Sequence, residues 1–174
     1  VSGTTVSYVD ASLRSTSTVK FKVVDVAGNS GAASSQLITI DTTAPATTAA
    51  VTAITDNVGL VQGTVASGAT TDDTSLAVSG TLSAALATGE VVRVYDGATY
   101  LGTATVTGTS WSFSDSRTLT NGQSVSYTAK VMDAGGNEGA AGTAYTATVD
   151  TNQPPQNIYS SNSVFPSTSL VTNA

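Results

Sequence analysis

The chain has no cysteine and no histidine. Without cysteine it can form no disulfide, and it offers no thiolate as a nucleophile or a soft metal ligand. Without histidine it lacks the most common general base of enzymes. The adjacent Asp72 and Asp73 would point in opposite directions on a strand and make a poor acid–base pair. We therefore expect a protein that is not an enzyme.

Charge is also scarce, and most of it has one sign. Charged residues make up 10% of the 174 residues, and the net charge is −6 with a pI near 4.1. This balance argues against nucleic acid or an anionic membrane surface as the partner. No apolar run approaches the roughly 20 residues needed to span a bilayer, so membrane insertion is not expected. No secretory leader is visible at Val1.

One phrase occurs twice in the sequence. Lys22-Val-Val-Asp-Val-Ala-Gly-Asn-Ser-Gly-Ala-Ala33 returns 108 residues later as Lys130-Val-Met-Asp-Ala-Gly-Gly-Asn-Glu-Gly-Ala-Ala141. A second pair follows at an offset of 109, with Asp41-Thr-Thr-Ala-Pro45 and Asp150-Thr-Asn-Gln-Pro154. Solenoid repeats have periods of about 20–50 residues, whereas an immunoglobulin-like sandwich has roughly 100. The period therefore predicts a tandem array of such domains.

Local patterns agree with an all-β fold. Val19, Phe21 and Val23 alternate with Lys20 and Lys22, which is the period of a half-buried strand. Apolar stripes with the spacing of a helix do not persist anywhere in the chain. Short apolar segments alternate with turns rich in Gly, Asn and Asp, which is typical of an Ig-like Greek-key β-sandwich.

The repeat divides the chain into three parts. Residues 1–44 are expected to hold the last strands of a preceding repeat, at Thr4–Val9, Thr18–Val24 and Gln36–Ile40. Residues 45–151 form one complete repeat, and residues 152–174 are a linker and the start of a following repeat or tail, with possible strands at 158–159 and 163–171. In the complete repeat, strands are expected at Thr48–Ile54 (A), Leu76–Leu82 (B), Glu90–Tyr95 (C), Tyr100–Val106, Val125–Met132 (F) and Ala144–Val149 (G), with Trp111 and Phe113 as large core residues.

Ten of the twelve acidic residues are Asp, and most lie at strand ends. In an Ig-like sandwich the A–B loop and the end of strand G share the pole where the chain leaves. The B–C and F–G loops share the other pole, where the chain enters. The exit pole is expected to gather Asp56, Asn57, Asp72, Asp73 and Asp150. The entry pole is expected to gather Asp41, Glu90, Asp133 and Asn137, with Asp25 and Asn29 as the F–G counterparts in the preceding repeat.

Carboxylates packed at one pole repel each other unless a cation neutralises them. Ca²⁺ takes six to eight oxygen ligands, and these loops offer oxygen without any soft ligand, which disfavours zinc or copper. We therefore predict Ca²⁺ at the poles. The alternative is that Asp and Asn only cap turns. An EF-hand is excluded, because no Asp-x-Asp-x-Asp-Gly loop ending in Glu is present.

Six short motifs occur along the chain. They are Asp41-Thr-Thr-Ala-Pro45, Thr55-Asp-Asn-Val-Gly59, Thr71-Asp-Asp-Thr74, Ser110-Trp-Ser-Phe113 and the two turns Asp25-Val-Ala-Gly-Asn29 and Asp133-Ala-Gly-Gly-Asn137. In these motifs, over about residues 18–155, the chain resembles the bacterial Ig-like repeats of giant biofilm-associated and RTX-type surface adhesins. The resemblance implies an extracellular extender repeat on the bacterial cell surface, stiffened by Ca²⁺ at domain junctions and supporting adhesion and biofilm formation.

The expected partners are adjoining Ig-like repeats of the same protein, and a cation between linker and loop would make bending at the junction costly. Two other functions stay open. The strands expected at the two ends of the chain lack pairing partners. The N-terminal strands of one subunit could therefore form a complete fold with the C-terminal tail of a neighbour, which would produce a filament. Tyr95 and Tyr100 flank the Asp96-Gly97 turn and would offer aromatic faces to a carbohydrate, although such pairs are more often cross-strand packing.

Overall fold

The computed structural model describes residues 7, 9 and 15–152. Regular structure in this part is entirely β, so the expected all-β class is confirmed. It contains no helix with the length and hydrophobicity needed to cross a bilayer. The strands are β1 (Ser17–Phe21), β2 (Ser34–Ile38), β3 (Ala49–Asp56), β4 (Gly63–Val65), β5 (Ala69–Thr71), β6 (Ala77–Leu82), β7 (Val91–Asp96), β8 (Thr99–Thr103), β9 (Thr105–Thr107), β10 (Ser110–Ser114), β11 (Ser124–Met132) and β12 (Tyr145–Val149).

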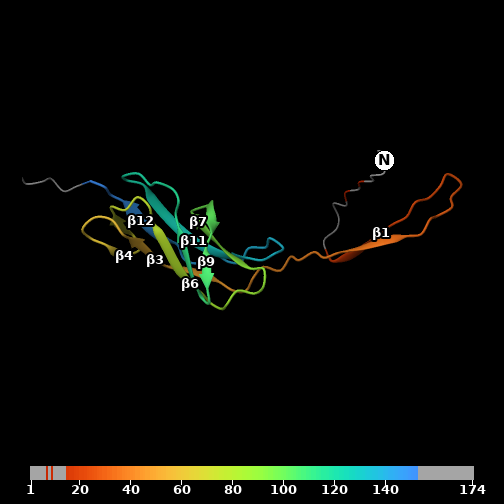
Figure 1. Ribbon diagram of the computed structural model, residues 1–174, viewed down its shortest axis with the longest axis horizontal. Helices are drawn as coiled ribbons and strands as arrows, with labels where there is room; N and C mark the ends of the chain where they lie inside the picture. Colours follow the sequence, from red (N-terminus) through yellow and green to blue (C-terminus); the bar gives the residue numbers. More distant parts are fainter. Residues whose placement is uncertain (1–6, 8, 10–14, 153–174) are drawn as a thin grey trace, which may run out of the picture.

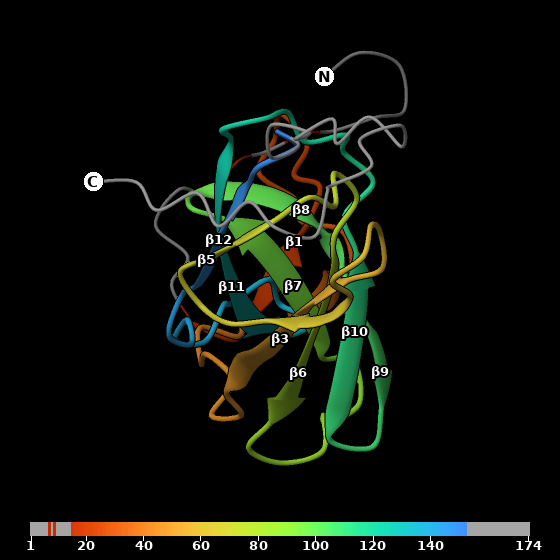
Figure 2. The same ribbon diagram turned by 90° about the vertical axis from the view of Figure 1, so that its left-hand side faces the viewer.

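Strands β3 to β12 form a sandwich of two five-stranded sheets (Figures 1 and 2). One sheet has the order β4-β3-β6-β10-β9, and the other has β5-β12-β11-β7-β8. All pairs are antiparallel except β5 with β12. In immunoglobulin terms, β3, β6, β7, β10, β11 and β12 are strands A, B, C, E, F and G, and β5 is an A′ strand that joins the second sheet. The topology is therefore that of an Ig-like Greek-key sandwich.

Two segments differ in detail from the sequence-based expectation. The long loop expected after strand A contains the short strands β4 and β5. The continuous strand expected over Tyr100–Val106 is divided at Ala104, where the chain passes between sheets. The Ala104 N–H still donates to the Val92 carbonyl at 2.9 Å, while Thr105 already pairs with Ser112 in the other sheet. A period-two pattern does not reveal such a crossing, because both halves keep the same alternation.

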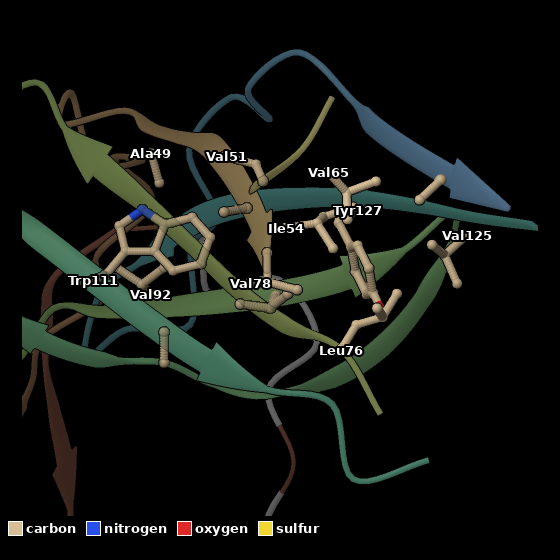
Figure 3. Packing of buried hydrophobic residues seen from close by; sticks show 14 of the residues in the cluster. Ala49, Val51, Ile54, Val65, Leu76, Val78, Val92, Trp111, Val125 and Tyr127 are labelled. Atoms are coloured by element: carbon tan, nitrogen blue, oxygen red, sulfur yellow. The ribbon is translucent and has the colours of Figure 1, made fainter. Parts of the chain in front are cut away.

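The core lies between the two sheets (Figure 3). Its largest fully buried side chain is Tyr127 on β11, and Val125, Ala129 and Val131 of the same strand alternate with half-buried residues. Trp111 packs against β6 at Gly80 and is almost fully buried, as expected. Val and Ala make up most of the other core residues, so these two aromatic rings are the largest side chains of the core.

Strands β1 and β2 form a separate antiparallel hairpin that extends from one end of the sandwich (Figure 1). They occupy most of the expected segments Thr18–Val24 and Gln36–Ile40. The expected strand at Thr4–Val9 lies mostly outside the described residues, and the expected strands at 158–159 and 163–171 lie wholly outside them.

The hairpin repeats the structure of the β11–β12 hairpin. Val125 pairs with Ala147, and the residues 108 and 109 positions earlier, Ser17 and Ile38, also pair. The turns match as well. The N–H of Gly31 donates to the carbonyl of Val23 at 2.8 Å, and the N–H of Gly139, 108 positions later, donates to that of Val131 at 2.8 Å. The sequence repeat is thus a repeat of strand register and turn geometry.

Candidate functional site: two acidic poles

The exit pole brings together acidic residues from three strand ends. Asp56 ends β3, Asp72 follows β5, and Asp150 follows β12. Since β5 and β12 are parallel, they end at the same pole, and the Asp150 N–H donates to the Thr71 carbonyl at 2.8 Å. All three Asp residues line one open cavity of about 640 Å³. The structure therefore brings these three residues to one cavity at this pole.

Asp56 and Asp73 hold the backbone of this pole together. Asp56 is only 7% exposed, and its two oxygens accept hydrogen bonds from the Thr71 hydroxyl at 2.6 Å and the Val58 N–H at 2.9 Å. The buried Asp73 accepts from the N–H groups of Ser75 at 2.7 Å and Asn57 at 3.2 Å. Asn57 thus takes part through its backbone. These two carboxylates act as turn caps.

Asp72 and Asp150 are exposed, unlike Asp56 and Asp73. The carboxylate of Asp72 lies against Gly59, where a Cβ would stand 2.1 Å from Oδ2. Asp150 accepts from the Asn152 N–H at 3.0 Å. No group of three His, Cys, Asp or Glu side chains in the described residues is close enough to hold a metal ion as placed. The donor type fits Ca²⁺, because every side-chain ligand on offer is a hard oxygen with unused lone pairs.

The entry pole joins the F–G turn to the incoming linker. Asp133 accepts from both the N–H and the side-chain amide of Asn137, each at 2.9 Å. The same amide donates to the Asp41 carbonyl at 3.2 Å. A Cβ on Gly135 would lie within 3.3 Å of atoms of all three residues. Hydrogen bonds from Asn137 hold the pKa of Asp133 below its usual value, so this carboxylate stays charged beside the linker.

Asp25 and Asn29 repeat this turn in the β1–β2 hairpin. Asp25 accepts from the N–H and the amide of Asn29, each at 2.8 Å, and these bonds lower its pKa in the same way. Glu90 closes the B–C turn by accepting from the Ala87 N–H at 2.8 Å. The structure therefore brings Asp41, Asp133 and Asn137 together, whereas the Glu90 carboxylate serves its own turn.

A buried ionic network was missed by the sequence analysis. Asp115 is almost fully buried and accepts from the Tyr127 hydroxyl at 2.6 Å and from Arg117 at 2.6–3.0 Å. Arg117 also binds Asp96 at 2.9 Å. Burial raises the pKa of Asp115, but the bonds from Arg117 and Tyr127 outweigh it and hold the pKa low. The signal in the sequence was the Asp-Ser-Arg spacing, which closes a local ion pair.

A second cluster lies on the outer face of the sheet formed by β7, β8 and β11. Arg93 pairs with Lys130 across strands, and both bind Glu138, at 2.7 and 2.9 Å. Tyr95 donates its hydroxyl to the same carboxylate. Tyr95 is only 8% exposed, and Arg93 also stacks on Tyr100, 3.8 Å from the ring centroid. The Tyr95 ring is therefore covered, and Arg93 occupies one face of the Tyr100 ring, a residue that is 43% exposed. In the sequence, the hint was that strands C and F each carry a cation, Arg93 and Lys130. Two cations that pair across strands favour a nearby anion such as Glu138.

Comparison with known proteins adds no family to this description. No family model and no curated protein sequence matches the chain. The fold is established by the strand order, and the function has to be argued from the repeated hairpin and the two poles.

Proposed function

We propose that this chain is a structural extender segment of a secreted bacterial cell-surface adhesin or fibre, supporting adhesion and biofilm formation. The observation that carries the proposal is the repeated F–G hairpin, with the same register and turn 108 residues apart. Among the described residues, the linker 39–48 joins the first hairpin to the sandwich. A protein built from such units gains length with each repeat and needs no catalytic residues.

The linker contact supports a stiff junction. The Asn137 amide holds both Asp133 and the carbonyl of Asp41, so the F–G turn of one unit binds the chain that enters it. A hydrogen bond of this exposed kind contributes about 1 kcal/mol, which is too little to prevent bending. We propose that Ca²⁺ adds the missing stiffness, held at the entry pole by Asp41, Asp133 and Asn137 and at the exit pole by Asp56, Asp72 and Asp150.

Carbohydrate binding has less support. A sugar platform needs an open aromatic face, and the Tyr95 ring is covered while the Tyr100 ring is stacked by Arg93. The contacts that cover these rings instead tie the F–G turn to strand β7 through Glu138, and β7 to β8 through Arg93.

Thermal unfolding in EDTA, millimolar Ca²⁺ or millimolar Mg²⁺ tests the calcium proposal. At a free concentration 100 times the Kd, each independent site adds about 2.7 kcal/mol to the free energy of unfolding. The expected result is a rise in melting temperature specific to Ca²⁺. Asp72→Asn combined with Asp150→Asn should abolish the exit-pole part of this rise, because it removes two of the proposed Ca²⁺ ligands. Both carboxylates are exposed, so the variant should still fold.

Glu90→Gln is the control, since it neutralises a carboxylate that serves its own turn, and each of the two Asp→Asn changes is also measured singly so that the charge removed is equal. Glu90→Gln should keep the full Ca²⁺ response. Equal melting temperatures in EDTA and Ca²⁺ would show that both acidic groups are turn caps and would remove the proposed source of stiffness.

A further inference from the structure

The face of the β1–β2 hairpin that carries Val19, Phe21 and Val23, called the inner face here, is apolar, and much of it is exposed. Phe21 is 58% exposed and Val23 is 81% exposed. The residues 108 positions later, Ala129 and Val131, are fully buried in the sandwich core. The two hairpins have the same register, so the difference lies in what covers them. Exposed apolar side chains on a two-stranded sheet are typical of a surface that has a partner.

The edges of the hairpin also lack neighbours. In the sandwich, β11 pairs on its other side with β7, antiparallel, and β12 pairs on its other side with β5, parallel. Within the described residues, β1 and β2 pair only with each other. Their outer edges therefore expose backbone groups that accept an added strand.

We propose that the hairpin formed by β1 and β2 is a docking surface for strands A to E of a further Ig-like unit of the same kind, supplied by chain that precedes the hairpin. A C-type strand adds antiparallel to β1, an A′-type strand adds parallel to β2, and the A-B-E sheet covers the inner face. This inference rests on the repeated unit of the proposed function, but it does not involve calcium.

The side chains indicate a partner with a shifted core. Val19 stands where the sandwich has Tyr127, and Phe21 stands where it has Ala129. The aromatic ring has thus moved one inward-facing position toward the turn, while the combined size of the two side chains is similar. The matching unit must be small opposite Phe21 and larger opposite Val19. Docking is therefore specific to a complementary core.

Hydrogen exchange on the full chain, with and without added strands, tests the proposal. In the chain of 174 residues, the amides of β1 that face outward from the hairpin should exchange quickly while those of β11 are protected. Residues 45–122 of the same sequence, which hold strands A to E, are then fused in front of residue 15. Val19→Tyr and Phe21→Ala are included, so that the hairpin matches the core that those strands normally cover. The β1 amides should become at least about 100-fold more protected, approaching β11.

Two further measurements keep the result decisive. A second fusion carries Val19→Tyr with Phe21→Asp, which places a charge at the centre of the new core and should abolish the protection. If the matched fusion leaves β1 exchanging as in the unfused chain, the proposal is wrong. If β1 in the unfused chain becomes protected as its concentration rises, with self-association in sedimentation, the occupant is a second copy and the proposal is equally overturned. All samples are measured in EDTA, so failure of the calcium proposal cannot produce either outcome.

Discussion

The hydroxyl of Tyr127 is the polar end of the largest buried side chain, and its contact with Asp115 joins strand β11 to the segment after β10. Tyr127→Phe keeps the ring but removes this donor from a buried carboxylate. We expect the free energy of unfolding to fall by about 1–3 kcal/mol, measured by urea denaturation with Trp111 fluorescence.

Tyr100→Phe is the control, because it removes a hydroxyl that bonds Thr103 on the surface. That change should stay within about 0.5 kcal/mol of the wild type. Equal losses in the two variants would show that the Tyr127 hydroxyl contributes no more than a surface contact.

Asp115 should also make the free energy of unfolding depend on pH. Its pKa in the folded protein lies below the ordinary value of 3.8, so its contribution is present above about pH 4 and is lost as the pH falls through the folded value. Arg117→Gln removes the cation while burial remains, which raises the pKa of Asp115. The acid loss of stability should therefore begin at higher pH in the variant, as measured by urea midpoints across the acidic range. If the urea midpoints of the variant and the wild type fall over the same acidic pH range, Arg117 does not set the pKa of Asp115.

At the scale of elements, Gly80 allows β6 to lie between β3 and the Trp111 ring. A Cβ at this position would stand 1.9 Å from the Ala50 carbonyl oxygen and 2.4 Å from the ring. Because neither the backbone nor the ring can move freely, Gly80→Ala should destabilise the sandwich by about 3 kcal/mol or prevent folding. Circular dichroism during thermal unfolding measures the effect.

Gly31→Ala is the comparison, since its new Cβ would meet only an ordinary contact of 3.6 Å. It should leave the sandwich unchanged. A tolerated Gly80→Ala would indicate that strand β3 and the Trp111 ring, both in the same sheet as Gly80, can shift at little cost.

Strands were the elements that the sequence predicted best. In β7, Val92 and Val94 alternate with Arg93. This alternation is enough to identify the inward face, because successive side chains of a strand point to opposite sides. The short strand β5 was missed, since Ala69–Thr71 has only three residues and depends on parallel pairing with β12, which comes much later in the chain. Local patterns do not contain that information.

The candidate site was predicted in part for a similar reason. Fold topology was enough to bring Asp56, Asp72 and Asp150 to one pole, because each lies at a strand end. It did not show that Asp56 would accept hydrogen bonds from the Val58 N–H and the Thr71 hydroxyl, or Asp73 from backbone N–H groups, since such bonds depend on loop conformation. Nor did it reveal the role of Glu138, whose partners come from separate strands.

At the scale of the whole molecule, a linker joins the hairpin to the sandwich (Figure 1). The carbonyl of Asp41 in this linker accepts a hydrogen bond from the Asn137 side-chain amide. The sandwich core draws all its residues from Ala49 onward. Removing residues 1–40 should therefore leave the melting temperature of the sandwich within about 2 °C of the intact chain, since a loss of 1 kcal/mol would shift a domain of this size by about 4–8 °C. Trp111, the single tryptophan, reports unfolding of the sandwich alone.

Removing residues 1–47 provides the contrast. It deletes the Asp41 contact and Pro45, whose carbonyl lies against Gly139, and it leaves the F–G turn without the chain that it binds. This longer deletion should lower the melting temperature further than the shorter one. A large drop already on removal of residues 1–40 would mean that the hairpin packs on its own sandwich. Its apolar face would then be covered in cis, and neither a preceding unit nor a free docking surface would be needed to explain it.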